Sequence, residues 1–124
     1  MYILIKTQKG DVKAEIQEKK NPKTAKGIIQ SLPINSIANT WGQEIYFEIP
    51  ISLELENAQQ DVEIGDLAYW PPGKAFCIFF GRTPVSKSEK PQAYSDVNVF
   101  GTIIEGLNFL QPIKDGDKIK VILG

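Results

Sequence analysis

The residues able to carry chemistry in this chain are few, and their types exclude most catalytic mechanisms. The 124 residues include no histidine, which removes Ser-His and Cys-His nucleophilic mechanisms and histidine-bound metals. Cys77 is the single cysteine, so neither an internal disulfide nor a Cys-x-x-Cys redox or zinc site can form. Its place in an apolar run favours a packed core thiol over a nucleophile.

Neither a metal nor a nucleotide cofactor has a recognisable binding pattern in the sequence. Asp115-Gly116-Asp117 is a short acidic stretch without the ligand spacing of a calcium loop, and it predicts a turn. No glycine-rich dinucleotide motif or phosphate-binding loop occurs. We therefore expect no metal and no cofactor.

Composition and charge describe one globular domain. Apolar residues make up 42% and charged residues 23%, so residues 1–124 can form a single domain with its own core. The net charge of −1 argues against a nucleic-acid surface, which needs clustered positive charge. The longest apolar run, Ala75–Phe80, is far shorter than the roughly 20 residues of a membrane span. Because the N-terminus also lacks a signal-peptide pattern, we expect a cytoplasmic protein.

Short β segments between turn-forming residues are expected to position the side chains. Ile51–Glu56 alternates three apolar residues with polar ones, the pattern of a half-buried strand. Pro50 separates it from the strand before, since proline cannot donate to a ladder. The other predicted strands are Tyr2–Lys6, Val12–Ile16, Glu44–Ile49, Leu67–Trp70, Ala75–Phe80, Val97–Ile104 and Lys118–Leu123.

One helix is predicted over Asn21–Leu32. Asn21 can cap it, and Pro22 suits its first position. Four apolar residues follow at the spacing of a single stripe, and Pro33 ends the helix. A shorter helical turn is predicted at Leu107–Leu110. Many short strands with one or two helices predict a mainly β fold, a closed antiparallel barrel, because closure removes vulnerable strand edges.

Four motifs, in order along the chain, resemble motifs of the cyclophilins. Asn21-Pro22-Lys23-Thr24-Ala25 is similar to the Pro-Lys-Thr-Ala start of the first cyclophilin helix. Val99-Phe100-Gly101-Thr102-Ile103-Ile104-Glu105-Gly106 is similar to the family's Val-Phe-Gly-Lys-Val-Val-Glu-Gly. Gly65–Trp70 with Phe76–Phe80, and Lys118–Gly124, resemble the central segments and the last strand of the family. Together the motifs most resemble the short prokaryotic cyclophilin-like proteins.

This resemblance implies a fold and an activity. The fold is a closed eight-stranded antiparallel β-barrel capped by one or two helices. The activity is peptidyl-prolyl cis-trans isomerisation, the rotation of an X-Pro amide against a barrier of about 18–20 kcal/mol. In the family an apolar slot holds the proline ring. A donor aimed at the prolyl nitrogen favours the twisted amide, and it comes from the arginine of a Phe-His-Arg-Ile-Ile-Pro segment.

The sequence departs from the cyclophilins at that arginine. Ile45-Tyr46-Phe47-Glu48-Ile49-Pro50 aligns on its proline, which puts Phe47 where the arginine should be. A phenyl ring has no hydrogen-bond donor. We predict that Phe47 lines the cleft, so that Phe47→Arg would return a donor to it. If the alignment is one residue out of register, Tyr46 faces the cleft instead, because successive strand residues point to opposite faces.

Seven residues are candidates for the site. Arg82, the only arginine, is the candidate catalytic donor, and the alternative is a surface arginine at a strand end. The candidate ligand-binding residues are Phe47, Tyr46, Glu44, Trp70, Phe80 and Tyr94.

The sequence leaves alternatives open for several of them. Trp70 is either a core side chain or part of the cleft wall, and Glu44 either orients a ligand amide or lies exposed on a strand. Phe80 shares a strand face with Phe76, and the alignment points that face toward the cleft, although a core role is the alternative. Tyr94, within a long polar loop, is either a cleft edge or a cover over the core.

Two functions follow from these observations. The first is a peptidyl-prolyl isomerase that lacks the usual arginine. The second is a non-catalytic cyclophilin-like module that binds a peptide or a small ligand. The expected partner is a proline-containing peptide or protein segment, or a small molecule in the cleft, and neither nucleic acid nor membrane is expected.

Overall fold

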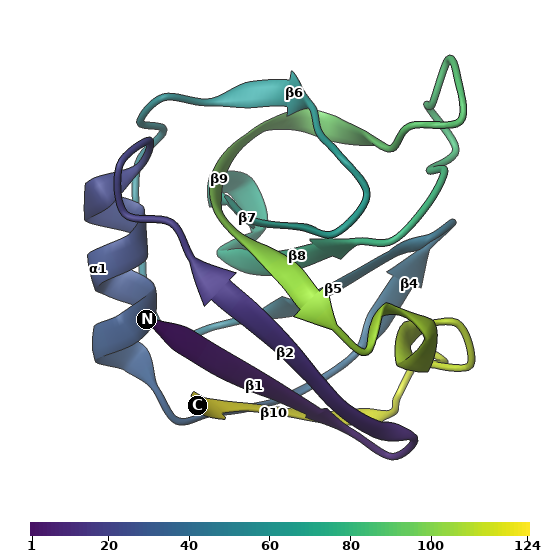
Figure 1. The fold of residues 1–124 in the computed structure, drawn as a ribbon. Helices are drawn as coiled ribbons and strands as arrows, with labels where there is room; N and C mark the ends of the chain where they lie inside the picture. Colours follow the sequence, from purple (N-terminus) through teal and green to yellow (C-terminus); the bar gives the residue numbers. More distant parts are fainter.

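Ten strands, one α-helix and two short 3₁₀-helices make up the fold (Figure 1). The structure is a computed structural model that describes residues 1–124. The strands are β1 (Tyr2–Thr7), β2 (Gly10–Ile16), β3 (Ile34–Ile37), β4 (Asn39–Trp41), β5 (Glu44–Glu48), β6 (Gln59–Asp61), β7 (Asp66–Trp70), β8 (Ala75–Phe79), β9 (Gln92–Glu105) and β10 (Lys118–Leu123). The helices are α1 (Pro22–Ser31), η1 (Pro71–Gly73) and η2 (Leu107–Leu110).

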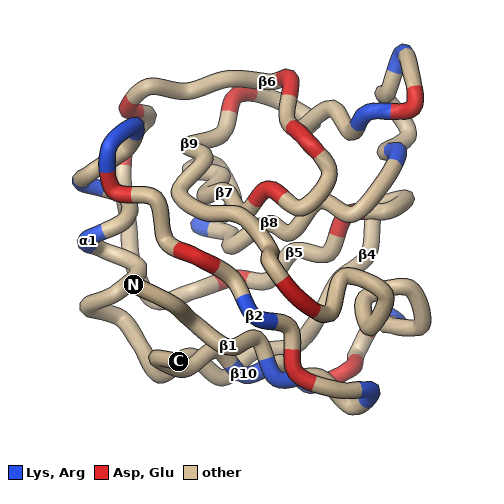
Figure 2. Tube along the Cα trace, in the orientation of Figure 1, with Lys and Arg blue, Asp and Glu red and all other residues tan.

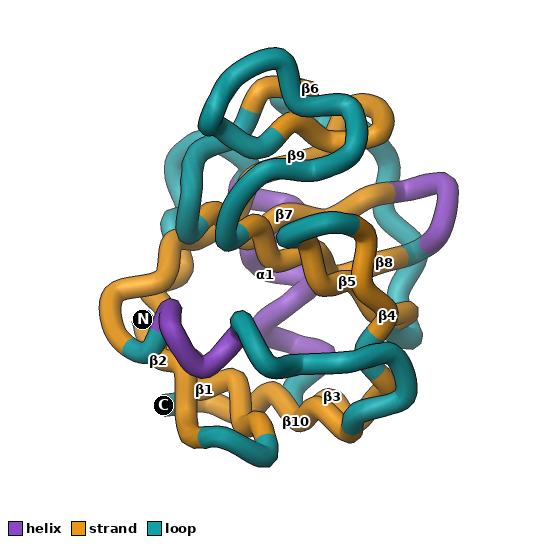
Figure 3. Tube along the Cα trace, turned by 90° about the vertical axis from the view of Figure 1, so that its right-hand side faces the viewer, coloured by secondary structure: helices purple, strands orange, loops and turns teal.

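The strands pair antiparallel in the order β3-β10-β1-β2-β9-β7-β8-β5-β4, and β6 pairs with β9 outside this path. At 14 residues, β9 is long enough to pair with β6, β7 and β2 along its length. Viewed from the side, β6 and β9 lie at one end of the molecule, and β1, β10 and β3 at the other (Figure 3). The prediction of a mainly β antiparallel fold is therefore confirmed.

Hydrogen bonds do not close this sheet, so the predicted closed eight-stranded barrel is not confirmed. The two edge strands, β3 and β4, are not paired with each other. They are instead consecutive in the chain and are separated by Ala38 alone. The backbone of Ala38 pairs with the turn before β10, because its N–H donates to the Asp117 carbonyl and its carbonyl accepts from the Gly116 N–H. The chain itself, rather than a strand ladder, connects the two edges of the sheet.

The interior of the curved sheet holds the main hydrophobic core, a cluster of 22 buried residues. Aromatic side chains fill its centre. Phe47 stacks on Phe76 with ring centroids 4.9 Å apart, and Phe100 meets Phe76 edge-on at 5.2 Å. A second cluster of eight buried residues lies on the opposite face of the strands β7, β8 and β9; it comprises Val62, Ala68, Ala75, Cys77, Phe79, Ala93, Val97 and Val99.

Helix α1 begins at Pro22, as predicted, but Asn21 does not cap it with its side chain. The amide of Asn21 is buried and donates to the Val99 carbonyl at 2.8 Å. The first free N–H groups of the helix, from Lys23 and Thr24, donate instead to the carboxylate of Glu56. A carboxylate suits this position because the N-terminus of a helix carries partial positive charge.

The predicted strand at Ile51–Glu56 is wrong, because this segment pairs with no other strand. Side chains satisfy its backbone in place of a neighbouring strand. The Tyr69 hydroxyl donates to the Ile51 carbonyl and accepts from the Leu53 N–H. The Asn98 amide accepts from the Glu56 N–H at 2.9 Å. Alternation alone could not reveal this, since buried side chains supply the same partners that a ladder would.

Charged residues of both signs are spread along the chain (Figure 2). Three exposed ion pairs occur, between Lys6 and Asp11, Arg82 and Glu89, and Lys90 and Glu63. No helix has the length and hydropathy needed to cross a membrane.

Candidate functional site

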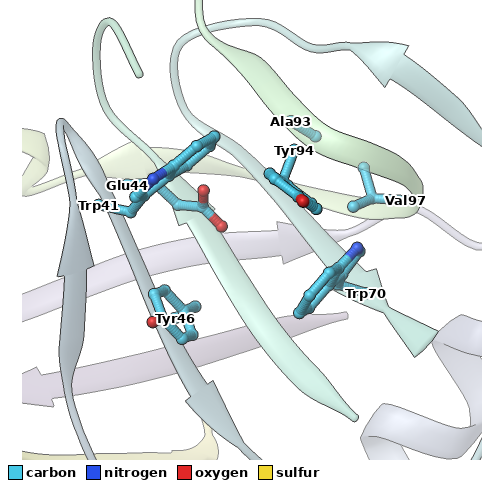
Figure 4. A pocket seen from close by; sticks show the side chains of 7 residues that line it. All are labelled: Trp41, Glu44, Tyr46, Trp70, Ala93, Tyr94 and Val97. Carbon is cyan, nitrogen blue, oxygen red and sulfur yellow. The ribbon is translucent and has the colours of Figure 1, made fainter. Parts of the chain in front are cut away.

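An aromatic pocket of about 210 Å³ lies on the outer face of the sheet (Figure 4). Four of the seven side chains around it are aromatic, and one is a carboxylic acid. They come from four strands: β4, β5, β7 and β9. The lining residues are Trp41, Glu44, Tyr46, Trp70, Ala93, Tyr94 and Val97.

Strand β5 supplies two of these residues through simple alternation. Glu44 and Tyr46 point outward to the pocket, whereas Ile45 and Phe47 are fully buried in the main core. Across the ladder, Tyr46 pairs with Cys77, which belongs to the smaller outer cluster. One strand therefore serves both the core and the pocket.

The pocket walls are rings that meet edge to face. Tyr94 lies between two indoles: its ring centroid is 5.9 Å from that of Trp41 and 6.1 Å from that of Trp70, with interplanar angles of 76° and 87°. The indole N–H of Trp70 donates to the Ser95 hydroxyl at 2.7 Å, which fixes the orientation of this ring. Tyr94 is 68% exposed and therefore stands at the mouth of the pocket.

Glu44 is the only charged residue among those that line the pocket. It is only 6% exposed, and no lysine or arginine forms an ion pair with it. Burial raises the pKa of its carboxyl group from 4.5 to about 7, although a hydrogen bond with the Cys77 thiol acts in the opposite direction. Burial, and next the nearby Glu44 charge, raises the pKa of Cys77 well above its usual value.

Figure 4 shows the Glu44 carboxyl group pointing into the space among the aromatic rings. The pocket thus combines apolar ring faces with one buried acidic group that has no cationic partner. Such a site can hold a ligand, and the acid can act either as a negative charge or, when protonated, as a hydrogen-bond donor.

Comparison with known proteins identifies the family to which this architecture belongs. The profile of the family described as cyclophilin-like matches residues 1–122, nearly the entire chain. The chain belongs to the cyclophilin-like family. A search among curated proteins found no match.

Two solved structures are similar to this cyclophilin-like chain. A hypothetical protein of Archaeoglobus fulgidus shares 40% sequence identity with a TM-score of 0.84, over 100% of this chain and 95% of the other. A cyclophilin-type peptidyl-prolyl cis-trans isomerase of Cryptosporidium parvum, crystallised in the presence of the dipeptide Ala-Pro, shares 19% identity. Its TM-score is 0.66, over 100% of this chain and 99% of the other. At that identity the second likeness shows the fold alone.

Within this cyclophilin-like fold, the predicted position of Phe47 in the cleft is wrong. Phe47 is fully buried in the main core, stacked on Phe76, and does not line the pocket. The neighbouring Tyr46 faces the pocket instead. The alignment is therefore one residue out of register, and a slip of one residue exchanges the two faces of a strand.

Phe80 also lies in the main core, so its predicted orientation toward the cleft is wrong. It continues the inward set of Phe76 and Ile78, while Cys77 and Phe79 belong to the outer cluster. The face of this segment that approaches the pocket is therefore the one that carries Cys77, which pairs across the ladder with the pocket residue Tyr46.

Arg82 lies outside the lining of the pocket, on the segment that follows β8. Its guanidinium is half-exposed and meets the Glu89 carboxylate at 3.4 Å. Four of the predicted site residues, Glu44, Tyr46, Trp70 and Tyr94, lie together in the pocket. Arg82 does not lie among them.

Three lining residues were not among the candidates from the sequence: Trp41, Ala93 and Val97. A signal for Trp41 was present in the sequence. Trp41-Gly42-Gln43-Glu44 reads as a two-residue turn, and such a turn places the residues on either side of it directly opposite each other. Trp41 and Glu44 are indeed a cross-strand pair in the β4–β5 hairpin. No comparable local signal indicates Ala93 or Val97.

Proposed function

We propose that this protein is a non-catalytic ligand-binding module of the cyclophilin-like family, and that its binding site is the aromatic pocket. The observation that carries the proposal is the buried Glu44 carboxyl group among four aromatic side chains, without a cationic partner. Burial raises the pKa of this carboxyl group to about 7, and a buried acid without a cationic partner is typical of a ligand site.

The contents of the pocket favour binding over catalysis. Isomerisation of the cyclophilin kind needs a donor aimed at the prolyl nitrogen, and no arginine or lysine lines the pocket. The aligned position, Phe47, is inside the core. The four aromatic residues of the pocket, in contrast, are tryptophans and tyrosines, which are enriched among the residues that dominate binding energy in protein interfaces.

The proposed ligand is a segment of a peptide or a small molecule. Part of the pocket is open to solvent at Tyr94, so the tip of a side chain can enter without the protein unfolding. The solved cyclophilin-type isomerase crystallised with Ala-Pro makes short proline-containing peptides a reasonable first set of probes.

Intrinsic fluorescence offers a direct test, because both tryptophans of the chain line the pocket. Titration with a library of short peptides and small organic molecules is expected to give saturable changes for some members. Trp70→Leu is expected to weaken binding of those members, whereas Tyr2→Leu, a change of an aromatic residue outside the pocket, is not. A flat response across the library, also in amide chemical shifts, would remove the proposal.

Peptidyl-prolyl isomerisation is a second candidate for the same pocket. The observation that favours it is the pKa of Glu44 at about 7, since a carboxyl group that keeps its proton can donate to an amide. A protease-coupled assay on several X-Pro tetrapeptides tests it. Activity from this donor would fall above pH 7 and would be lost in Glu44→Ala, and a rate at background with micromolar protein excludes the candidate.

A further inference from the structure

We propose that the ligand of this pocket carries an organic cation, an ammonium or guanidinium group, which lies against the aromatic faces and pairs with the Glu44 carboxylate. This inference deepens the proposed function, because it requires that the pocket is a ligand site. It commits to the charge of the ligand, which the proposed function leaves open.

Charge complementarity is the first argument. Glu44 is only 6% exposed and has no ion-pair partner. Its carboxyl group points into the pocket (Figure 4). A buried carboxylate without a partner is costly, and a cation that enters the pocket removes that cost. An anionic ligand would instead meet the same carboxylate as a repulsive group.

The ring geometry is the second argument. A cation is attracted to the face of an indole or phenol ring within about 6 Å of its centroid. Trp41 and Trp70 both meet Tyr94 at nearly perpendicular angles, so the three rings form walls of different orientation rather than a single stack. With Tyr46 they surround the space into which Glu44 points. Aromatic walls of this kind with one acidic group are suited to alkylated ammonium groups.

The other groups near Glu44 do not compete with a ligand cation. The titratable side chains that face it are the Cys77 thiol from β8, Tyr46 from its own strand and Tyr94 from β9. Strands β4 and β7 contribute only the indoles of Trp41 and Trp70. None of these carries positive charge, so the cation must come from outside the chain.

The size of the pocket limits what can enter. About 210 Å³ holds a head group such as trimethylammonium or guanidinium, but not a whole large ligand. The remainder of the ligand then extends past the exposed Tyr94. Both a small amine and the side chain of a lysine or arginine in a peptide present this chemistry.

The test compares choline with its neutral isostere 3,3-dimethyl-1-butanol, followed by tryptophan fluorescence and amide chemical shifts. We expect choline to bind at least about 10-fold more tightly, the scale of one charge-assisted interaction. The choline affinity should rise from pH 6 to pH 8, because the carboxylate form of Glu44 binds the cation and its pKa is about 7.

Variants assign the effect to the pocket. Glu44→Gln keeps the shape of the side chain and removes its charge, so it should weaken choline binding by about 10-fold or more and abolish the pH dependence. It should leave binding of the neutral isostere unchanged. Glu48→Gln is the matched control, since Glu48 is an exposed acid on the same strand, and it should behave as the native protein does.

A second pair of probes distinguishes the source of the cation. If the peptide acetyl-Gly-Arg-Gly-amide binds more tightly than n-butylguanidinium, a peptide chain supplies the cation; if the two are equal, a small molecule does. Equal binding of choline and its isostere, or unchanged choline binding in Glu44→Gln, would overturn the inference. If neutral peptides bind while cations do not, the inference that the ligand is a cation is wrong, but the proposed ligand-binding function stands. If no probe binds, both the inference and the proposed function fail.

Discussion

The two faces of the β5–β8 ladder carry different kinds of side chains. The inner face carries Ile45, Phe47, Phe76 and Ile78, all fully buried in the main core. The outer face of the same two strands carries Glu44, Tyr46, Cys77 and Phe79. The inner set is apolar throughout, whereas the outer set includes an acid and a thiol whose pKa values are both raised.

The difference shows that one face of the sheet contributes mainly to stability, whereas the opposite face contributes to the proposed ligand binding. Stacked rings on the inner face gain from close packing and have no polar group to satisfy. On the outer face a buried carboxyl group lowers stability and keeps the capacity to interact with a ligand. Substitutions on the inner face are therefore expected to lower stability at every pH, and those on the outer face to change binding and the dependence of stability on pH.

The largest effect is expected from Phe47→Arg on the inner face. An arginine there is a buried, unpaired charge, so the free energy of unfolding should fall by about 3–5 kcal/mol or more, and no isomerase activity should appear. Urea unfolding followed by circular dichroism measures the loss. Tyr46→Arg on the outer face is the control, since its guanidinium can reach solvent or the Glu44 carboxylate. Equal losses in the two variants would contradict the assignment of the faces.

The second effect is a dependence of stability on pH through Glu44. The native carboxyl group keeps its proton up to about pH 7, whereas the unfolded chain releases it near 4.5. The native state therefore binds more protons in this window, and the contribution of Glu44 to stability falls as pH rises through it, by about 3 kcal/mol in total. Above pH 7, Glu44→Gln should be more stable than the native protein by up to that amount.

Urea unfolding of both proteins at pH 4, 5, 6, 7 and 8 measures this difference. The gap between Glu44→Gln and the native protein should widen from pH 5 to pH 7 and then stay constant. Glu48→Gln serves as the control on the same strand. A gap that is independent of pH would mean that Glu44 is not desolvated in the native protein.

A smaller effect on stability, but a clear one on binding, is expected from Tyr94→Ala. Its ring is 68% exposed, so the free energy of unfolding should change by no more than about 0.5 kcal/mol. Affinity for choline should fall by about 2- to 5-fold, the contribution of one exposed cation–π contact. Tyr2→Ala removes another partly exposed tyrosine outside the pocket, and it should leave choline affinity unchanged.

The smallest effect is expected from Arg82→Ala. The ion pair with Glu89 is exposed, and such pairs contribute about 0–1 kcal/mol. Stability, ligand affinity and any rate of prolyl isomerisation should therefore stay close to those of the native protein. A clear loss of isomerisation in this variant alone would restore Arg82 as the catalytic donor.

Much of the fold could be predicted because its signals are local. The turn and alternation signals identified most strands, and Pro22 and Pro33 marked the ends of α1 to within two residues. The β3, β4 and β6 strands were missed because they have only three or four residues, and β3 and β6 pair with strands far away in the sequence. Ile51–Glu56 was misassigned because its partners are the side chains of Tyr69 and Asn98, which no pattern within the segment reveals.

The register of β5 could have been read more closely from its own residues. Glu44-Ile45-Tyr46-Phe47-Glu48 alternates charged or amphipathic side chains with purely apolar ones, which favours Ile45 and Phe47 as the buried pair. Alignment on the proline alone overrode this pattern. The grouping of Trp70, Tyr94 and Glu44 in one pocket depends on pairings among β7, β8, β9 and β5, and those distances cannot be obtained from spacing along the chain.

The position of β10 has a consequence for how this chain acquires its structure during synthesis. This strand lies between β1 and β3, which leave the ribosome well before it, since β10 follows all the other elements of this fold in the chain. Until it emerges, β1 and β3 each lack a neighbour, and their unpaired edges are open to other chains. Contacts between segments so distant in sequence also slow folding. Refolding rates should therefore respond more strongly to substitutions that weaken the β1–β10 ladder than to changes in the local β1–β2 hairpin.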